Sequence, residues 1–289
     1  MNGSRHIAHR RSADQTEQAV AEHLLEVSAI CGKLAQKIDA SEAGNLLGLL
    51  HDLGKYSNDF QAYIKSATDM LNPDIDNEYG DAKALKGKID HSTAGAQWIW
   101  QRFKDYGLQG QLVDQMLAVC LASHHGGLLD CLKVDGKNGF QKRINKEDTH
   151  THLLECLQAA DDEVIEQLEQ LSGKEFLDKF WAHLVAIVAP EKKESPVMQQ
   201  FRLGLFTRFL FSCLIDADRI NSADFEDPAK AKARSTGAVD WQPAIERMEA
   251  KNASFSIRNA IDTVRREISE QCRQRAEDEQ GIFRMEFWW

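Results

Sequence analysis

The sequence predicts a protein built almost entirely of α-helices. Apolar residues recur at spacings of three and four through most of the chain, which is the period of an amphipathic helix, and no segment shows the alternation of a convincing strand. Five of the ten histidines lie in or at the ends of these apolar stretches, and carboxylates accompany them. Together these observations predict a helical bundle with a metal site at its centre.

The length and composition are those of an ordinary soluble protein with a substantial core. Of 289 residues, 43% are hydrophobic and 28% are charged, so the chain can form one large domain or two. No apolar run approaches the roughly 18 residues of a membrane span, and the first residues lack a signal-peptide core. We therefore predict a cytoplasmic protein with no membrane partner.

The net charge and the cysteine content argue against some kinds of function but do not identify one. A net charge of −10 argues against a broad basic face for nucleic acid, but bound divalent metals would invert the potential of an acidic pocket, so a nuclease is not excluded. The six cysteines form no C-x-x-C pair, and most lie in apolar helical stretches. We interpret them as reduced core residues rather than zinc ligands.

The N-terminal half predicts helices separated by polar segments. Residues 1–14 form a short basic start without a clear period, and the first amphipathic stripe follows from Thr16 to Ile38. The next apolar run ends near Gly54, which suits a helix C-terminus, and residues 70–90 form a polar loop. The predicted helices cover residues 16–38, 41–53, 58–66, 93–103 and 111–123.

The C-terminal half begins with a basic segment. Residues 130–148 are loop-like, and we interpret them as a solvated loop or as a flap that contacts phosphate; their basic residues are Lys133, Lys137, Lys142, Arg143 and Lys146. Pro190 and the charged residues 191–194 mark a linker. Further helices are predicted over residues 151–171, 176–188, 197–220, 243–251 and 256–275.

An adjacent histidine and carboxylate, His51 and Asp52, stand where an apolar helical run ends. Because the chain leaves its helical path at Gly54, both side chains can point at one spot. Imidazole and carboxylate together suit a divalent transition ion better than calcium. Lys55 directly follows Gly54 and could contact a phosphate that is bound to such a metal.

Other histidines and carboxylates are placed in the same way. A single histidine on an apolar face is more often a hydrogen-bonded core residue, but five of them with a His-Asp and a His-His pair favour a metal site. Carboxylates at the end of a strongly apolar segment are costly to bury unpaired, so one of Asp216 and Asp218 is expected to meet a metal or a cation. The candidates are His23, His51, Asp52, His91, His124, His125 and Asp216 or Asp218.

The other five histidines are interpreted as structural or exposed. They lie in the basic start or on helices without acidic partners, at positions 6, 9, 150, 152 and 183.

The ordered set of these residues resembles the HD metal-dependent phosphohydrolase superfamily. More closely, it is similar to the HD nuclease domain of the CRISPR-associated nuclease-helicase of type I interference systems. The similarity covers about residues 16–225. It rests on Glu22-His23-Leu24-Leu25-Glu26-Val27, Gly48-Leu49-Leu50-His51-Asp52-Leu53-Gly54-Lys55-Tyr56, Asp90-His91-Ser92-Thr93-Ala94-Gly95-Ala96, Ala122-Ser123-His124-His125-Gly126-Gly127 and Asp216-Ala217-Asp218-Arg219.

This resemblance implies an HD-domain helical bundle that cleaves single-stranded DNA with one or two metal ions. One metal would be held by His23, His51, Asp52 and Asp218. The second would be held by His91, His124 and His125, with Asp52 bridging. Asp218 is preferred to Asp216 because the Ala-Asp-Arg triplet resembles the final motif, and the alternative role for Asp216 is to orient the site. The catalytic residues would be His51, Asp52 and Lys55.

The donor set also indicates which metals to expect. Imidazole-rich ligation favours manganese, iron, cobalt or nickel over magnesium, which remains compatible. The phosphate-binding signature G-x-x-x-x-G-K-[ST] does not occur in the sequence, so we predict no ATP site in this chain. The resemblance therefore implies a helicase part or subunit and a CRISPR surveillance complex as partners, in addition to single-stranded DNA.

Two domains are expected, an HD nuclease core over residues 1–225 and a helical extension over residues 226–289. The extension would pack on the core or lead to a helicase that is missing or separate, and Trp288 and Trp289 at its end would pack on the domain or dock a partner. Two other functions remain open. One is an HD phosphohydrolase acting on nucleotides or cyclic nucleotides, and the other is a metal-binding recruitment module without catalysis.

Overall fold

A computed structural model describes residues 6–67, 89–131, 133–188, 195–234, 240–276 and 278 of the chain. The chain forms two compact units, residues 1–233 and 234–289. The functional division predicted at residue 225 stays a prediction. Trp288 and Trp289 and most of the polar loop over residues 70–90 lie outside the described residues.

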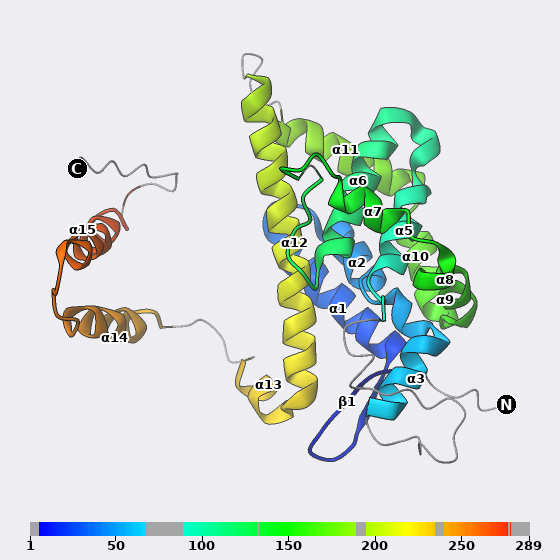
Figure 1. Ribbon diagram of the computed structural model, residues 1–289, viewed down its shortest axis with the longest axis horizontal. Coiled ribbons are helices and arrows are strands. Elements are labelled where there is room, and N and C mark those ends of the chain that lie inside the picture. Colours follow the sequence, from blue (N-terminus) through cyan, green and yellow to red (C-terminus); the bar gives the residue numbers. More distant parts are fainter. Residues whose placement is uncertain are drawn as a thin grey trace. The chain divides into compact units, whose positions relative to one another are not determined.

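The all-helical prediction is confirmed, and the first unit is a bundle around a buried cluster of histidine and aspartate (Figure 1). Short 3₁₀ turns follow α1, α2 and α5 at Gln36–Ile38, Leu53–Tyr56 and Lys104–Tyr106. The α-helices of this unit are α1 (Val20–Ala35), α2 (Ser41–Leu50), α3 (Asn58–Ala67), α5 (Thr93–Arg102), α6 (Gly107–Ser123), α7 (Gly139–Ile144), α8 (Asp148–Thr151), α9 (Leu153–Ala159), α10 (Asp162–Leu171), α11 (Lys174–Val188), α12 (Pro196–Glu226) and α13 (Pro228–Arg234).

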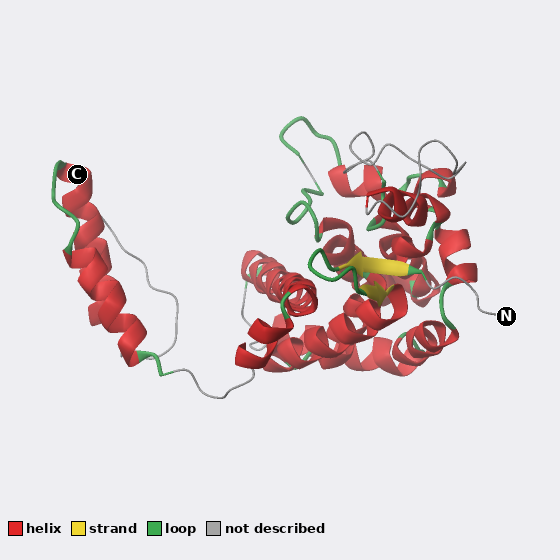
Figure 2. Cartoon of the chain, turned by 90° about the horizontal axis from the view of Figure 1, so that it is seen from below, coloured by secondary structure: helices red, strands yellow, loops and turns green. Residues whose placement is uncertain are grey.

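One element was not predicted from the sequence, a two-stranded antiparallel hairpin drawn in yellow in Figure 2. Its strands are β1 (Ile7–Arg10) and β2 (Glu17–Ala19), and the register pairs His9 with Gln18. The basic start thus forms a strand, and the first helix begins at Val20 rather than at Thr16. Strands of four and three residues are too short to show a period of two.

Two helix boundaries also differ from the predictions. The segment 130–148, predicted as a loop, contains α7, where Asn138 caps the helix by accepting a hydrogen bond from the backbone N–H of Gln141 at 2.8 Å. The helix predicted over residues 151–171 is divided into α9 and α10, because Ala160 and Asp161 are extended. Both differences concern a short helix or the ends of helices, where hydrophobic spacing is least informative.

The core centres on a close crossing of α1 and α2, and α12 runs beside both (Figure 1). Gly48 of α2 lies against the backbone of α1, where an added Cβ would be 2.4 Å from the Cα of Ser28. Beside it, Asn45 donates to the carbonyl of Ser28 at 2.9 Å, and the Ser28 hydroxyl donates to the carbonyl of Asn45 at 2.9 Å. This small interface brings His23 and His51 to the same depth in the bundle.

The second unit contributes α14 (Gln242–Ala253) and α15 (Ala260–Gln274), and neither helix has a buried residue. Their exposed apolar side chains include Trp241, Ile245 and Ile261. Among all described helices, none is both long enough and apolar enough to cross a membrane.

Asp114 is a buried carboxyl group of α6 that contacts the end of α5. Its two oxygens accept hydrogen bonds from the backbone N–H of Phe103 at 3.2 and 3.0 Å. Burial raises the pKa of Asp114 to about 7, although the hydrogen bond from Phe103 acts in the opposite direction.

The variant Asp114→Asn should weaken the pH dependence of stability. Since the folded-state pKa of Asp114 is raised, its contribution is complete below about pH 4 and is lost as the pH rises through about 7. Between about pH 5 and about pH 8 the parent protein should lose roughly 2–3 kcal/mol relative to the variant, whose amide oxygen still accepts from Phe103. Urea denaturation at both pH values measures the free energy of unfolding. An equal change in this free energy with pH for the two proteins would contradict the prediction.

Candidate metal centre

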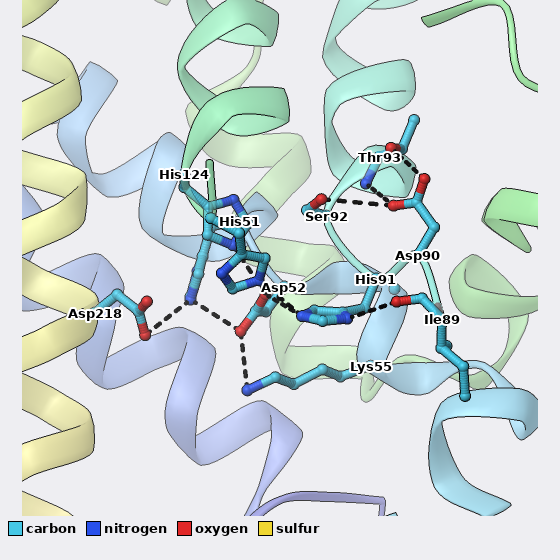
Figure 3. A network of polar contacts seen from close by, with 12 residues as sticks. His51, Asp52, Lys55, Ile89, Asp90, His91, Ser92, Thr93, His124 and Asp218 are labelled. Atoms are coloured by element: carbon cyan, nitrogen blue, oxygen red, sulfur yellow. Dashed lines mark hydrogen bonds and ion pairs between the residues drawn. The ribbon is translucent and has the colours of Figure 1, made fainter. Parts of the chain in front are cut away.

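Seven side chains from five parts of the bundle converge in its interior, as Figure 3 shows for most of them. Each comes from a helix or from a helix end. They are His23 of α1, His51 and Asp52 after α2, His91 before α5, His124 and His125 after α6, and Asp218 of α12.

The end of α2 explains how two adjacent residues reach one spot. His51 keeps helical angles (φ −57°, ψ −40°), and its N–H donates to the carbonyl of Leu47 at 3.0 Å. Asp52 then leaves the helix (φ −119°, ψ 27°) and starts the following 3₁₀ turn. The break lets both side chains face one spot, but it occurs at Asp52, two residues before Gly54, where the sequence predicted it.

The end of α6 has a similar construction. His124 still closes the last turn, and the Ser123 hydroxyl accepts a hydrogen bond from the N–H of Leu129 at 3.0 Å. Gly127 adopts φ +81°, a left-handed conformation that favours glycine. The His-His-Gly-Gly sequence thus turns the chain back just after it has presented two imidazoles.

Three of the imidazoles are oriented by hydrogen bonds from Nδ1 to carbonyl oxygens of the chain. His51 Nδ1 is 2.7 Å from the oxygen of Gly48, and His124 Nδ1 is 2.7 Å from that of Leu121. His91 Nδ1 lies 3.2 Å from the oxygen of Ile89. Because a carbonyl only accepts, the proton is on Nδ1 and the Nε2 lone pair faces the centre.

Asn221 orients the fourth imidazole. Its Oδ1 lies 2.7 Å from His23 Nδ1, and its Nδ2 donates to Glu26 at 2.6 Å. The amide is therefore oriented with its oxygen toward His23, which gives that ring the same tautomer as the others. Asn221, which follows Asp218 by almost one helical turn, is not among the residues predicted from the sequence.

Asp52 lies between two groups of imidazoles, and each of its oxygens faces one group. Oδ2 is 3.5 Å from His23 Nε2 and 3.4 Å from His51 Nε2. Oδ1 is 3.2 Å from His124 Nε2, 3.7 Å from His125 Nε2 and 3.9 Å from His91 Nε2. The buried carboxylate thus belongs to both groups.

Asp218 completes the group on the Oδ2 side. Its Oδ1 is 3.8 Å from His23 Nε2 and 3.7 Å from His51 Nε2. The donor atoms of His23, His51, Asp52 and Asp218 all lie within 4.8 Å of one another, as do those of Asp52, His91 and His125. Within the described residues Asp216 belongs to neither set.

The protonation states suit a cation. Burial tends to raise the pKa of Asp52, but the charge of Lys55 and then that of His51 hold it well below its usual range. Burial, with the charge of Lys55, lowers the pKa of His23 to about 4. Burial also lowers the pKa of His91 to about 4. His51 differs, because the charges of Asp52 and Asp218 outweigh burial and raise its pKa.

The geometry itself calls for a positive charge between the rings. His23 Nε2 and His51 Nε2 are only 3.2 Å apart, yet both rings donate from Nδ1. Two lone pairs at that distance repel unless a proton or a metal lies between them. The donor set of neutral imidazoles and ionised carboxylates fits a divalent transition metal.

Lys55 is buried beside Asp52 and has two polar partners in the described part of the chain. Its Nζ lies 2.9 Å from Asp52 Oδ2 and 3.1 Å from His9 Nε2. His9 also packs edge-on against the ring of His23, with centroids 4.7 Å apart. The hairpin thus brings His9, interpreted from the sequence as structural or exposed, next to the candidate metal centre.

The expectation that His152 lacks acidic partners is wrong. Its ring nitrogens lie 3.2 Å from carboxylate oxygens of Asp59 and of Glu155. Asp59 is far from it in the sequence.

The basic segment is partly engaged within the protein. Arg143 donates to the hydroxyls of Ser92 and Thr93, and Lys146 pairs with Asp90. Asp90 in turn accepts hydrogen bonds from Thr93 at the start of α5 (Figure 3). These contacts hold the backbone on both sides of His91. The side chains of Lys133, Lys137 and Lys142 remain exposed.

Comparison with known families decides the assignment. The model of the family described as "Cas3, HD domain" matches residues 8–222. The chain belongs to this family. The match spans β1 to α12 and includes all seven converging residues. No curated protein matches the chain.

Family membership implies an HD-type, metal-dependent hydrolase of the nuclease class found in CRISPR systems. It confirms the resemblance inferred from the ordered histidines. It also agrees with the buried histidine and aspartate cluster, which can hold a metal ion.

Loss of the Asn221 amide should weaken metal binding. In Asn221→Leu the N–H of His23 has no acceptor, so the ring is free to change tautomer or rotate. We expect the affinity for Mn²⁺ or Ni²⁺ to fall about 10–100-fold, measured by isothermal titration calorimetry. Circular dichroism of the metal-free variant checks that the helices remain, and unchanged affinity would contradict the orienting role.

Gly54→Ala should disturb the group of imidazoles on the Oδ1 side of Asp52, which includes His91, and should leave the group on the Oδ2 side unchanged. An added Cβ would lie 2.4–2.7 Å from three backbone atoms of His91, so His91 must move away from Asp52. We expect fewer Mn²⁺ ions bound per chain, measured by mass spectrometry of the equilibrated protein. Gly204→Ala is the matched control, since an added Cβ there meets nothing within 4 Å. Equal metal content in both variants would refute this expectation.

Proposed function

We propose that this chain is a nuclease that hydrolyses phosphodiester bonds of single-stranded DNA in type I CRISPR interference. A helicase part or subunit and a CRISPR surveillance complex would supply the DNA. The observation that carries the proposal is the position of Asp52, whose two oxygens face two separate groups of imidazoles. A carboxylate shared in this way is typical of centres with two metals.

The proposed ligands follow from this division. One ion would be held by His23, His51, Asp52 and Asp218, and the other by Asp52, His91, His124 and His125. Manganese, iron, cobalt or nickel would suit so many imidazoles better than magnesium. When bound, such ions activate a water molecule, orient the phosphodiester and stabilise the leaving oxygen.

The accessibility of the two groups supports a polymeric substrate. The side chains of His23 and His51 are fully buried, whereas that of His125 is 46% exposed and that of His91 is 23% exposed. A strand can therefore approach from the side of His91 and His125 without entering an enclosed pocket. A hydrolase for small nucleotides is expected to surround its substrate.

Lys55 would stabilise negative charge on the phosphate. Its ammonium is buried and lies 2.9 Å from Asp52, so it borders the centre without being a metal ligand. A cation held in a site of low dielectric interacts more strongly with developing charge than it would in water. His51 and Asp52 are the other residues proposed to be essential for catalysis.

A cleavage assay tests the proposal. Purified protein is incubated with linear and circular single-stranded DNA, with duplex DNA and with nucleotides, in the presence of manganese, cobalt, nickel or a chelator. We expect metal-dependent cleavage of single strands, and cutting of the circle would show endonuclease action. His51→Ala and Asp52→Asn should each lose more than about 100-fold, whereas His150→Ala, an exposed residue of α8, should retain activity.

Two outcomes would count against the nuclease. Cleavage that persists in the Asp52→Asn variant would show that the centre is not responsible. Turnover of nucleotides without cleavage of DNA would favour an HD phosphohydrolase instead.

A further inference from the structure

We propose that His9 is a positioning residue that acts through Lys55. Resting on the proposed function, this inference holds that His9 and Asp52 together fix the Lys55 ammonium so that its remaining N–H faces the phosphate.

The direction of the hydrogen bond follows from the chemistry of the two groups. An ammonium carries three N–H donors and no lone pair, so in the contact between Lys55 Nζ and His9 Nε2, at 3.1 Å, lysine donates and the imidazole accepts. The proton of the His9 ring is then on Nδ1. A second N–H of Lys55 is directed at Asp52 Oδ2, 2.9 Å away. Two of the three donors are thereby placed.

Hydrogen bonds hold the hairpin that contains His9 against the turn that contains Lys55. Gln61 of α3 is buried, and its side-chain amide donates to the carbonyls of both Ile7 and Lys55, at 3.0 and 2.8 Å. Its oxygen accepts from the N–H of Ile7 at 2.9 Å. One side chain thus sets the distance between strand β1 and the 3₁₀ turn after α2.

A further hydrogen bond connects the other end of strand β1 to α12. The Arg11 side chain donates to the carbonyl of Phe225 in α12 at 2.7 Å, and its guanidinium lies 4.8 Å from the centre of the Phe225 ring. His9 is therefore held between two anchored neighbours. A long, flexible lysine side chain gains most from such an acceptor, because the acceptor selects one of its many conformations.

His9 makes a polar contact with Lys55 and ring contacts with His23 and Phe225, and two variants separate the polar contact from the ring contacts. His9→Phe keeps an aromatic ring against His23 but removes the acceptor for Lys55. His9→Gln removes the ring and places a carbonyl oxygen near the position of Nε2. A positioning role predicts that Gln is the better substitute, whereas a packing role for His23 predicts that Phe is.

The first test is independent of catalysis. In ¹⁵N NMR spectra of the full chain, the two-bond correlations of His9 should show an Nδ1-protonated ring. The Nε2 resonance should shift when Lys55 is replaced in Lys55→Met. A ring protonated on Nε2, or a resonance indifferent to Lys55→Met, would overturn the inference even if the chain cleaves no DNA.

The second test measures coupling in the cleavage of single-stranded DNA. We expect His9→Phe to lower kcat about tenfold or more, with metal content unchanged, and His9→Gln to recover most of the loss. In the Lys55→Met background His9→Phe should have no further effect. His6→Phe is the control, because the His6 ring contacts Tyr56 rather than the centre. Additive losses, or a better Phe than Gln variant, would refute the role of His9.

Discussion

The buried carboxylate of Asp52 is the feature on which the rest of the site depends. An isolated carboxylate in a protein interior costs several kcal/mol even after relaxation, and Asp52 is buried at the centre of the bundle. It is tolerated because the Lys55 ammonium and the imidazole of His51 supply positive charge beside it. The other imidazoles around it complete the donor set that a metal ion would share with the carboxylate. The helices around it therefore have to arrive in one fixed arrangement, since each of them delivers one of these partners.

The charge balance of the centre explains why a metal belongs to this arrangement. Asp52 and Asp218 are both ionised, and Lys55 is the only lysine or arginine paired with either of them in the described chain. The surrounding rings of His23 and His91 are neutral at physiological pH. One negative charge is left over. It raises the pKa of the imidazole of His51. A bound divalent ion would more than balance it and would leave a positive centre for an anionic phosphate.

The sequence predicted the converging residues because their signals are local. His51 and Asp52 lie at the end of an apolar run, and the two glycines after His125 indicate a turn. What it did not predict depends on contacts between distant segments. Nothing near Asn221 shows that it faces His23, 198 residues away. His9 lies in a strand too short to show a period, and its role depends on how Gln61 fixes that strand.

The two groups around Asp52 differ in how they are built. His23 and Asp218 lie within α1 and α12, and His51 closes the last turn of α2, so the rigid packing of these helices determines their geometry. His91 and His125 lie outside regular helix, and the positions of such residues depend on contacts with neighbouring elements. Around His91 these are the contacts of Gly54 in the 3₁₀ turn after α2 and of Arg143 in α7. The same difference makes the second group accessible. The proposed substrate, a strand of DNA, needs one open side of the site, and here that side is formed by His91 and His125, which lie outside regular helix.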